Sequence, residues 1–538
     1  MIRCTWKYAV LILLATEAGI TLVDGQELSV NRIRIYFSNT GGLDETQDQE
    51  SSWVGWGKSD WSYPSIFIFD QGLWVTGKRN GGYGWVPYLW TSSFSPGPII
   101  DGRPAMSVRP QDSSRYKVYT IAVGETPETN SDVAAWPVDL GAPADSAGHP
   151  RIFGDQTAWE VFNGADTTLA GYLFRTRNLT PRALLPIEVH ETMFEHFAEF
   201  TDTTVWANTV FFEWSVYNKG PDPLDSVYLS LWTDLDFVNF FETIPAVDTA
   251  AQTGYCWYGT DSTFAAGGYT LLFGPSVPSA NDTAVFFGKK KAGFKNLPLA
   301  SFRGINDDSY PDSSLFGPPY SLGTAWNVVR GYMQNGAPFI DSTTRQPTMF
   351  PYSGDPITHT GSLWPFNSTG GGAGFMITSG PFSLAAGDSQ WIMAAVHPAE
   401  KRNGVDAINR MRDDARYLRS LPYDSLVTRK PRRGIPIKPL PVFSAPSSFK
   451  LYSCYPNPFN SGTTIQFDLP EVSMVRIEVY DALGRLAAST GDQVFGLGTQ
   501  SVHWSPVVAS GVYFIRVKAA SIQSKSLWTG VNKVVMIK

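Results

Sequence analysis

Short runs of alternating apolar and polar residues occur along nearly the whole chain, separated by glycine, proline, asparagine and aspartate. Residues 33–37 (IRIYF) alternate with a period of two, and residues 65–76 and 83–90 flank the dipeptide of Asn80 and Gly81. A period of two places side chains on alternate faces of a strand, and Asn-Gly is a strong signal for a tight hairpin. The pattern is typical of β-sandwiches. Further strands are expected over residues 117–123, 159–162, 187–200, 210–218, 226–233, 284–288 and 390–396.

The composition favours an all-β extracellular chain. Of the 538 residues, 14% are aromatic and only 17% are charged, and the chain contains 49 Gly and 38 Pro. Aromatic residues suit strands, whereas glycine and proline punctuate turns. The net charge of -7 argues against nucleic acid as a partner, because such binding needs clustered Lys and Arg.

One segment departs from the strand pattern. Within residues 404–418, Val405, Ile408, Met411 and Ala415 recur at helical spacing, and no proline interrupts them. This periodicity predicts one peripheral helix that packs across a face or an edge of the sandwich body.

The first 25 residues have the features of a secretory signal peptide. Arg3 and Lys7 precede or flank an apolar run over residues 8–15, which is too short to span a bilayer. No later segment approaches the length of a membrane-spanning helix, so we expect a secreted chain without a transmembrane segment.

A proline-rich stretch divides the rest of the chain. Six prolines and five basic residues, four of them within residues 429–433, fall within residues 422–446, and such segments are extended and semi-rigid. We therefore expect a large β-rich region over residues 26–421, built as one or two sandwiches, a linker over 422–446 and a terminal domain over 447–538. Cys256 and Cys454 fall in different predicted domains, and they are expected as unpaired thiols, with a bridge between domains as the alternative.

The terminal domain carries four ordered motifs. Its seven short strands in about ninety residues indicate an immunoglobulin-like sandwich. The first motif is Tyr455, Pro456, Asn457, Pro458, Phe459 and Asn460, the second is residues 479–485 with Gly484 and Arg485, the third is residues 511–514 with Gly511 and Tyr513, and the last is the closing KVVMIK, which ends at Lys538.

These motifs resemble the type A C-terminal sorting domains of the type IX secretion system. The resemblance implies that the type IX secretion machinery is a partner and that the protein passes from the periplasm to the surface of a Gram-negative bacterium, where it is anchored or released. The same pattern also resembles the immunoglobulin-like domain of flagellar hook-capping proteins. Motifs in the body, among them residues 155–159 (DQTAW) and 232–236 (WTDLD), are similar to uncharacterised surface proteins of Bacteroidota-like bacteria and imply no activity.

Acidic residues gather after the strand predicted over residues 226–233. Oxygen ligands that alternate along one loop suit Ca²⁺, which is the one cofactor predicted. The alternative is a solvated turn in which aspartates accept hydrogen bonds from backbone amides. The candidate metal ligands are Asp234, Asp236, Asn239, Glu242 and Asp248.

A second polar segment superficially resembles a zinc-protease motif. His190 and His196 lie six positions apart, whereas that motif places its histidines on successive turns of one helix. On a strand, His190 and Glu188 would share one face, and Glu191 and Glu195 would share the other. We expect a polar strand ladder, with a zinc site or a glycosidase carboxylate pair as alternatives.

Six tryptophans fall within 38 residues of the N-terminal part of the chain. Exposed indoles stack on sugars and other flat ligands, whereas buried indoles fill cores. We expect core and edge packing, with ligand stacking as the alternative. The six are Trp53, Trp56, Trp61, Trp74, Trp85 and Trp90.

The sequence contains no Gly-x-Ser-x-Gly motif and no phosphate-binding loop, and no catalytic residue is singled out. We therefore expect a secreted or surface-displayed, non-catalytic β-sandwich protein that contacts a surface glycan, other surface proteins or further copies of itself. A secreted polysaccharide-acting hydrolase and a hook-capping-like extracellular assembly protein are the alternatives.

Overall fold

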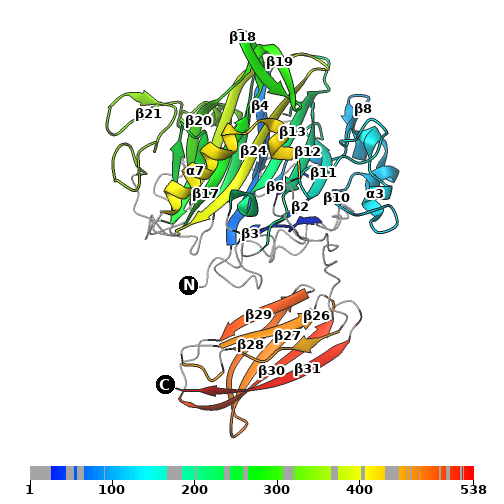
Figure 1. Cartoon of the computed structure of the whole chain (residues 1–538), viewed down its shortest axis with the longest axis vertical. Helices are drawn as coiled ribbons and strands as arrows, with labels where there is room; N and C mark the ends of the chain where they lie inside the picture. Colours follow the sequence, from blue (N-terminus) through cyan, green and yellow to red (C-terminus); the bar gives the residue numbers. More distant parts are fainter. Residues whose placement is uncertain are drawn as a thin grey trace. The chain divides into compact units, whose positions relative to one another are not determined.

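The computed structural model divides the chain into two compact units, Met1–Ile435 and Pro436–Lys538. Both consist mainly of strands (Figure 1), which confirms the predicted all-β fold. The segment predicted to be a signal peptide lies outside the described residues. The structure describes residues 26–43, 54–56, 66–89, 91–166, 184–199, 202, 204–235, 243–258, 265–306, 319, 321–364, 373–401, 406–429, 448–455, 457–460, 463–471, 473–495, 498–504, 509–521, 524 and 526–537.

The first large sheet of the body has the strand order β1-β2-β3-β4-β14-β23-β20, and β5 and β6 extend it from β4. The predicted hairpin joins β4 to β5: Asn80 and Gly81 both have positive φ, 51° and 79°, as a primed two-residue turn requires. The strands are β1 (Gln26–Leu28), β2 (Ile33–Phe37), β3 (Val54–Trp56), β4 (Ile66–Arg79), β5 (Gly82–Leu89), β6 (Thr91–Ser92), β14 (Leu224–Leu235), β20 (Leu299–Asn306) and β23 (Ala373–Leu384).

The second large sheet has the order β10-β11-β12-β13-β24-β17-β16-β15, and β7 pairs with β11. Each pairing on this path is antiparallel. The strands are β7 (Ser95–Pro96), β10 (Tyr119–Ala122), β11 (Gln156–Asn163), β12 (Ile187–Glu195), β13 (Val210–Asn218), β15 (Thr243–Asp248), β16 (Thr253–Tyr258), β17 (Ala265–Phe273) and β24 (Ser389–Glu400).

The two sheets enclose one apolar core. Alternate residues of β12 and β13, such as Val189 and Phe212, belong to the same buried cluster as Leu231 of β14 and Ile377 of β23. Burial of one such side chain stabilises the fold by roughly 1.5–3 kcal/mol. Because both sheets contribute to one core, the body is a single sandwich, and the alternative of two sandwiches does not describe it.

Helices cover the outer faces of both sheets. The predicted helix is present as α7 (Ala407–Ser420), and it packs Ile408 and Met411 on the outer side of β16, β17 and β24. A second helix of comparable role, α6 (Leu322–Val329), was not predicted from the sequence, and it covers the outer face of the first sheet through Trp326. The sequence predicted one peripheral helix, and the described residues form a second one, α6, as well.

Shorter elements connect or flank these sheets. The short helices are α2 (Ala105–Val108), η2 (Pro110–Arg115), α3 (Ser131–Ala134), η3 (Val138–Leu140), η5 (Val205–Asn208) and α8 (Tyr423–Val427). The short or separate strands are β8 (Ile99–Ile100), β9 (Arg103–Pro104), β18 (Ser276–Phe286), β19 (Lys289–Asn296), β21 (Phe339–Ile340) and β22 (Pro347–Thr348).

The segment expected to be a linker over residues 422–446 begins as part of the body. In α8, Leu426 and Val427 are buried in a cluster with Trp391 of β24. Arg429 then forms an ion pair with Asp155, with 2.7 Å between Nε and Oδ1. The apolar residues between the prolines bury their side chains, so the boundary predicted at residue 422 was too early; residues 430–447 lie outside the described ranges.

The second unit is a seven-stranded sandwich with its own core. One sheet has the order β25-β26-β29 and the other β28-β27-β30-β31. Residues such as Phe467 and Ile515 are buried between them. The strands are β25 (Lys450–Leu451), β26 (Thr463–Leu469), β27 (Ser473–Asp481), β28 (Leu486–Phe495), β29 (Gly498–Trp504), β30 (Gly511–Ser521) and β31 (Leu527–Met536).

The two cysteines of the described residues are buried and are not joined in a disulfide. Cys256 lies in the body core and Cys454 in the core of the second unit. Burial raises the pKa of the Cys454 thiol, which keeps it protonated and unreactive.

We expect Met411→Ala to destabilise the body by about 2–4 kcal/mol, because it removes a fully buried side chain and leaves a cavity under α7. Chemical denaturation of the full chain would measure the change. The matched control is Met474→Ala, whose side chain is 43% exposed and whose loss should cost less than about 0.5 kcal/mol. Equal effects of the two substitutions would contradict the packing of α7.

Candidate functional site

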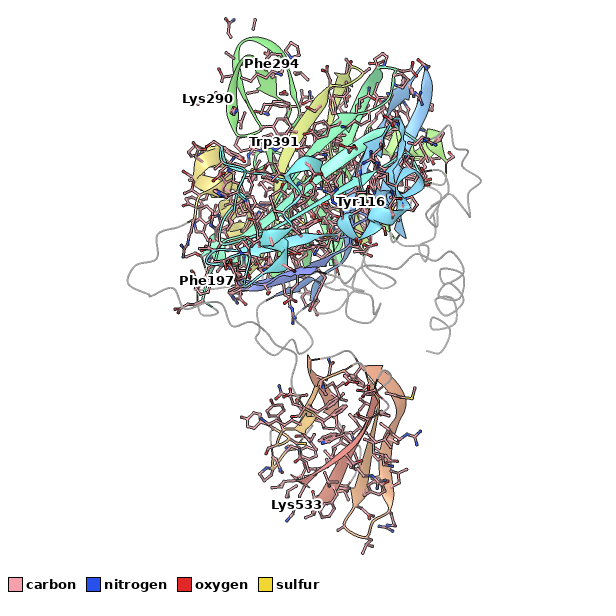
Figure 2. The ribbon with its side chains drawn as sticks, turned by 90° about the vertical axis from the view of Figure 1, so that its right-hand side faces the viewer. Tyr116, Phe197, Lys290, Phe294, Trp391 and Lys533 are labelled. Atoms are coloured by element: carbon pink, nitrogen blue, oxygen red, sulfur yellow. The ribbon has the colours of Figure 1, made fainter. Side chains whose placement is uncertain are left out.

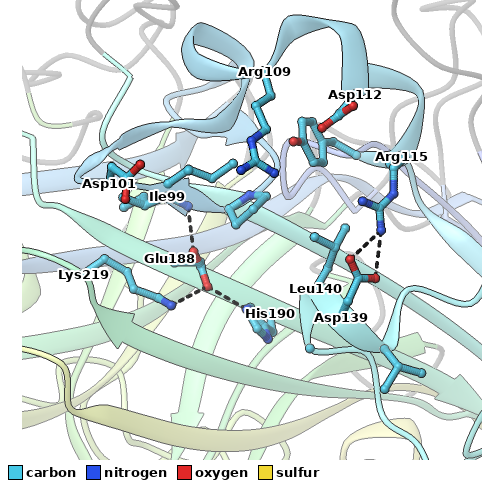
Figure 3. Close-up of a pocket in the computed structure, with 15 residues that line it drawn as sticks. Ile99, Asp101, Arg109, Asp112, Arg115, Asp139, Leu140, Glu188, His190 and Lys219 are labelled. Atoms are coloured by element: carbon cyan, nitrogen blue, oxygen red, sulfur yellow. Dashed lines mark hydrogen bonds and ion pairs between the residues drawn. The ribbon is translucent and has the colours of Figure 1, made fainter. Parts of the chain in front are cut away.

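A pocket of about 630 Å³ lies on the outer side of the second sheet, where the chain between β8 and η2, the η3 turn and strand β12 meet (Figure 3). Its volume is in the range of small-ligand sites. It is lined by Pro98, Ile99, Ile100, Asp101, Arg109, Asp112, Arg115, Tyr116, Val138, Asp139, Leu140, Gly141, Glu188, His190 and Lys219.

Glu188 of β12 forms the floor of this pocket, which we call the Glu188 pocket. Its side chain is 3% exposed. One carboxylate oxygen, Oε1, lies 2.9 Å from His190 Nε2 and 3.1 Å from Lys219 Nζ. The other, Oε2, accepts a hydrogen bond from the Ile99 backbone N–H at 2.7 Å. Both oxygens of this carboxylate are therefore occupied by protein groups.

The charge state of Glu188 follows from these contacts. Burial alone would raise the pKa of this carboxyl group, but the His190 side chain, the Ile99 N–H and the Lys219 ammonium together hold its pKa below the ordinary value. Glu188 is therefore ionised at neutral pH. An ionised carboxylate with three donors anchors its neighbours, and it is poorly placed to deliver a proton as a general acid.

His190 is wedged between aromatic side chains and a glycine. Its ring centroid lies 4.7 Å from that of Tyr217 and 5.7 Å from that of Trp159. Gly141 has a φ of +103°, and a Cβ at this position would lie 2.3 Å from His190 Cε1. The glycine is therefore required on two grounds: it permits the left-handed turn after η3, and it leaves room for the imidazole.

The rim of the pocket carries charges of both signs. Arg115 Nη2 donates to both carboxylate oxygens of Asp139, at 2.8 and 2.7 Å. Figure 3 shows the Arg109 side chain directed from the chain between α2 and η2 into the pocket, with no bond marked to the other residues drawn. Asp101 and Asp112 add acceptors to the lining. The pocket thus offers a guanidinium donor and carboxylate acceptors within one volume.

The structure separates the polar residues of β12 by face. Glu188 and His190 line the pocket, whereas Glu191 and Glu195 are fully buried on the side of the inter-sheet core. Within the described residues, no group of three or more His, Cys, Asp or Glu side chains is arranged to hold a metal ion.

Two buried carboxyl groups lie side by side on neighbouring strands of the second sheet. Glu160 of β11 lies directly opposite Glu191, and Glu191 lies opposite Trp214 of β13. Burial, followed by the neighbouring Glu191, raises the pKa of Glu160 well above its ordinary value, and burial raises the pKa of Glu191 to about 8. Elsewhere in the sheet, burial raises the pKa of Glu213 to about 7. Glu160 and Glu191 are therefore protonated at neutral pH and belong to the core, whereas Glu213 accepts hydrogen bonds from Trp391 and Tyr423.

The predicted calcium ligands are only partly described. Asp234 lies at the end of β14, opposite Asp70 of β4. Asp248 lies on the other sheet, where its carboxylate contacts Arg412 at 3.5 Å and Arg416 at 3.1 Å. These two aspartates therefore belong to different sheets. Asp236, Asn239 and Glu242 lie outside the described residues, and calcium binding stays a prediction.

Two of the six clustered tryptophans pack inside the body. Trp74 and Trp85 are fully buried, their ring centroids lie 5.3 Å apart, and Trp74 Nε1 donates to the Tyr88 carbonyl at 2.6 Å. Burial excludes both from ligand stacking. Trp56 lies in β3, and its side chain is not described. Trp53, Trp61 and Trp90 lie outside the described residues.

The opening motif of the second unit binds its last strand. Asn457 donates through Nδ2 to the Lys533 carbonyl and accepts from the Val535 N–H through Oδ1, both at 2.9 Å. Phe459 is buried, and its backbone bonds to Val535 and Ile537 at 2.9 and 2.8 Å. The first and last of the four motifs are thus in contact. Tyr455 and Asn460 are exposed beside this contact, Pro458 follows Asn457, and Pro456 and Lys538 lie outside the described residues.

The two middle motifs build a turn and a strand end. Gly484 has a φ of +76°, and Arg485 closes the turn with 2.7 Å between its Nε and Asp481 Oδ2. Gly511 begins β30, and the buried Tyr513 donates its hydroxyl to the Ala509 carbonyl at 2.8 Å. A tyrosine hydroxyl bonded to the backbone just upstream is a recurrent device of immunoglobulin-like sandwiches.

Sequence reasoning missed most of the Glu188 pocket. Glu188 and His190 were recognised as sharing a strand face, but Arg109, Lys219 and Asp139 were not singled out. These residues come from separate segments of the chain with no shared spacing, so only the folded chain brings them together. The glycine at residue 141 was the one local signal, because glycine is favoured where φ is positive.

The second unit defines a class of exported proteins. Residues 453–528 match the family model of the secretion system C-terminal sorting domain. The chain therefore carries a type IX secretion system C-terminal sorting domain, as its motifs predicted. This domain implies engagement with the type IX machinery and export to the cell surface or secretion. Among the described residues, no helix is long and apolar enough to cross a membrane.

Comparisons of the whole chain are less informative. No curated protein matches it in sequence. A polysaccharide lyase structure is similar at 7% identity and a TM-score of 0.25, over 95% of this chain and 47% of the lyase. The dimeric latent PorU from Porphyromonas gingivalis is similar at 12% identity and a TM-score of 0.14, over 71% of this chain and 32% of PorU. The chain thus spans less than half the length of either protein, and no activity follows from such scores.

We expect the body to lose stability as the pH rises through the range in which its buried carboxyl groups ionise. The folded pKa of Glu191 is about 8, above that of an exposed glutamate, so the native state binds more protons than the unfolded state and its stability falls with rising pH. Thermal unfolding at about pH 5.5 and about pH 8.5 should therefore show a lower Tm at the higher pH. Glu191→Gln should weaken this dependence. Glu128→Gln, at an exposed site, should leave it unchanged, and a flat profile of the unaltered chain would contradict the prediction.

We expect Asn457→Ala to loosen β31, because it removes two hydrogen bonds to that strand. The loss should be about 1–3 kcal/mol. Hydrogen–deuterium exchange of residues 533–537 in the full chain would detect it as faster exchange. The control is Asn460→Ala, at an exposed neighbouring position, and unchanged exchange in both variants would show that the opening motif does not secure the last strand.

Proposed function

We propose that this exported protein is a non-catalytic binding protein and that its body binds a saccharide in the Glu188 pocket. The sorting domain would place the body at the cell surface or in the medium. The observation that carries the proposal is the chemistry of the pocket: an ionised, fully bonded carboxylate at the floor, and donors and acceptors at the rim.

A saccharide suits this lining because each hydroxyl group both donates and accepts hydrogen bonds. Arg109 supplies donors, and Asp101 and Asp112 supply acceptors. Ile99 and Leu140 provide apolar surface between them, which suits the C–H faces of a sugar ring. A ligand of one charge sign would meet repulsion from part of this lining.

Binding rather than hydrolysis is supported by the state of the carboxylates. Hydrolysis of a glycosidic bond needs a protonated carboxyl group and a second carboxylate at the same site. In the Glu188 pocket the floor carboxylate is ionised and engaged by three donors. The protonated glutamates, Glu160 and Glu191, lie in the core between the sheets instead.

We expect Arg109→Ala to weaken saccharide binding about tenfold or more, because a charge-assisted hydrogen bond contributes roughly 1.5–3 kcal/mol. A glycan array of neutral and acidic oligosaccharides would identify a ligand for the full chain, and calorimetry would then compare the variants. Arg345→Ala is the matched control, because Arg345 is an exposed arginine of the body that does not line the pocket.

Three outcomes would overturn the proposal. Equal affinity of the unaltered chain and the Arg109→Ala variant would remove the ligand from this pocket. Release of reducing ends from a polysaccharide, lost in Glu188→Gln, would make the protein a hydrolase and Glu188 a participant in its chemistry. Absence of any bound glycan, together with self-association of the full chain, would favour a structural role.

A further inference from the structure

Strands β18 and β19 form a two-stranded sheet of their own, apart from both large sheets of the body. Figure 1 shows this hairpin projecting beyond the neighbouring strands of the body. A two-stranded ribbon has too little core to be stable alone in water. An element of this kind is therefore retained either as a packing device or as a surface that reaches a partner.

The hairpin is strongly basic in an acidic protein. Residues 276–296 contain four lysines and one aspartate, a net charge of +3, whereas the whole chain carries -7. Lys289, Lys290 and Lys295 are exposed. Among the described residues, the ion pairs formed by lysines involve Lys117, Lys219 and Lys518, and none involves the hairpin. Its one acidic group, Asp282, is bonded by the Ser279 hydroxyl.

Aromatic rings hold the fourth lysine in place. The Lys291 ammonium lies 3.7 Å from the centroid of Phe294 and 4.7 Å from that of Phe286. Such cation–π contacts fix the stem of the lysine while its charge stays near the surface. In Figure 2, Lys290 and Phe294 lie on the projecting part of the hairpin, with Trp391 in the body below them.

The hairpin is anchored at its base and at its turn. At the base, Ser276 and Gln390 exchange two hydrogen bonds, at 3.0 and 2.9 Å. At the turn, the ring centroid of Phe287 lies 6.4 Å from that of Trp391. Gly288 has a φ of +70°, and a Cβ there would lie 2.3 Å from the Tyr423 ring. The lysines are therefore displayed on an ordered platform, which lowers the entropic cost of binding.

We infer that the β18–β19 hairpin is a binding surface for an anionic polysaccharide, a function separate from the Glu188 pocket. Lysine ammoniums on flexible stems act as point charges, which suit a polymer of repeated negative groups better than one bidentate anion. Several such charges on one hairpin gain from the repeated negative groups of a polymer. An anionic membrane is less well matched, because surface insertion needs a broad apolar face, and Phe287 is the one large apolar side chain exposed on the described hairpin.

The test is binding of polygalacturonate to the full chain, measured by calorimetry at low and high salt. The unaltered chain should bind, and binding should weaken as salt screens the charges. The affinity of the double variant Lys289→Glu and Lys290→Glu should be lower by about tenfold or more, because two attractions become repulsions. The matched control is Arg103→Glu with Lys450→Glu, which makes the same change in net charge at two exposed positions elsewhere; it should bind like the unaltered chain.

Further variants separate this surface from the pocket and from misfolding. The Lys289→Glu and Lys290→Glu variant should keep the affinity of the unaltered chain for a neutral glycan held in the Glu188 pocket, because neither lysine lines that pocket, so that the two proposals can fail separately. Lys289→Gln with Lys290→Gln should give intermediate weakening, and unchanged Tm values would show that the hairpin variants are folded. Any of three results would overturn the inference. These are equal weakening of binding by the control pair, binding that does not depend on salt, and binding to phosphatidylglycerol vesicles without binding to the polysaccharide.

Discussion

The pleat of the two large sheets is the constraint on which the body depends. The long strands of both sheets send alternate side chains into one shared core and the rest outward. On β12 this alternation separates Glu188 and His190, which line a pocket, from Glu191 and Glu195, which are buried. A shift of one residue in the pairing of β12 would exchange the two sets. The pocket and the core are therefore set by the same register.

Buried glutamates show how much the register matters. Glu160 and Glu191 lie opposite each other in the core, where two negative charges could not both be tolerated. Burial holds them protonated by raising their pKa values. Neutral carboxyl groups can hydrogen-bond within a dry interior at a smaller cost than ions. The same strand thus contains one glutamate kept ionised by three donors and others kept neutral by burial, a few residues apart.

The fold was more predictable from the sequence than the site. Period-two alternation located the sandwich strands, Asn80 and Gly81 marked a hairpin, and helical spacing located α7. The helix α6 was missed because eight residues are too few to show a clear helical period, and its packing is decided by the sheet beneath it. The start of the linker was predicted too early, because the prolines of this segment were given more weight than the apolar residues of α8. The sequence could not predict that Arg109 and Lys219 line the same pocket as Glu188, because the three residues lie far apart in the chain and share no local pattern.

The second unit shows a different relation between motif and structure. Its four motifs are far apart in the sequence, yet Asn457 and Phe459 of the first bind the strand that carries the last. The exposed side chains near this contact, such as Tyr455, contribute little to the core, whereas the buried ones determine whether the end of the chain is held in the sheet. Because the opening motif bonds to β31 through both its side chain and its backbone, the last strand is held in its sheet only when the first motif is in place. The order of the last strand is therefore a property of the folded unit and not of its local sequence alone.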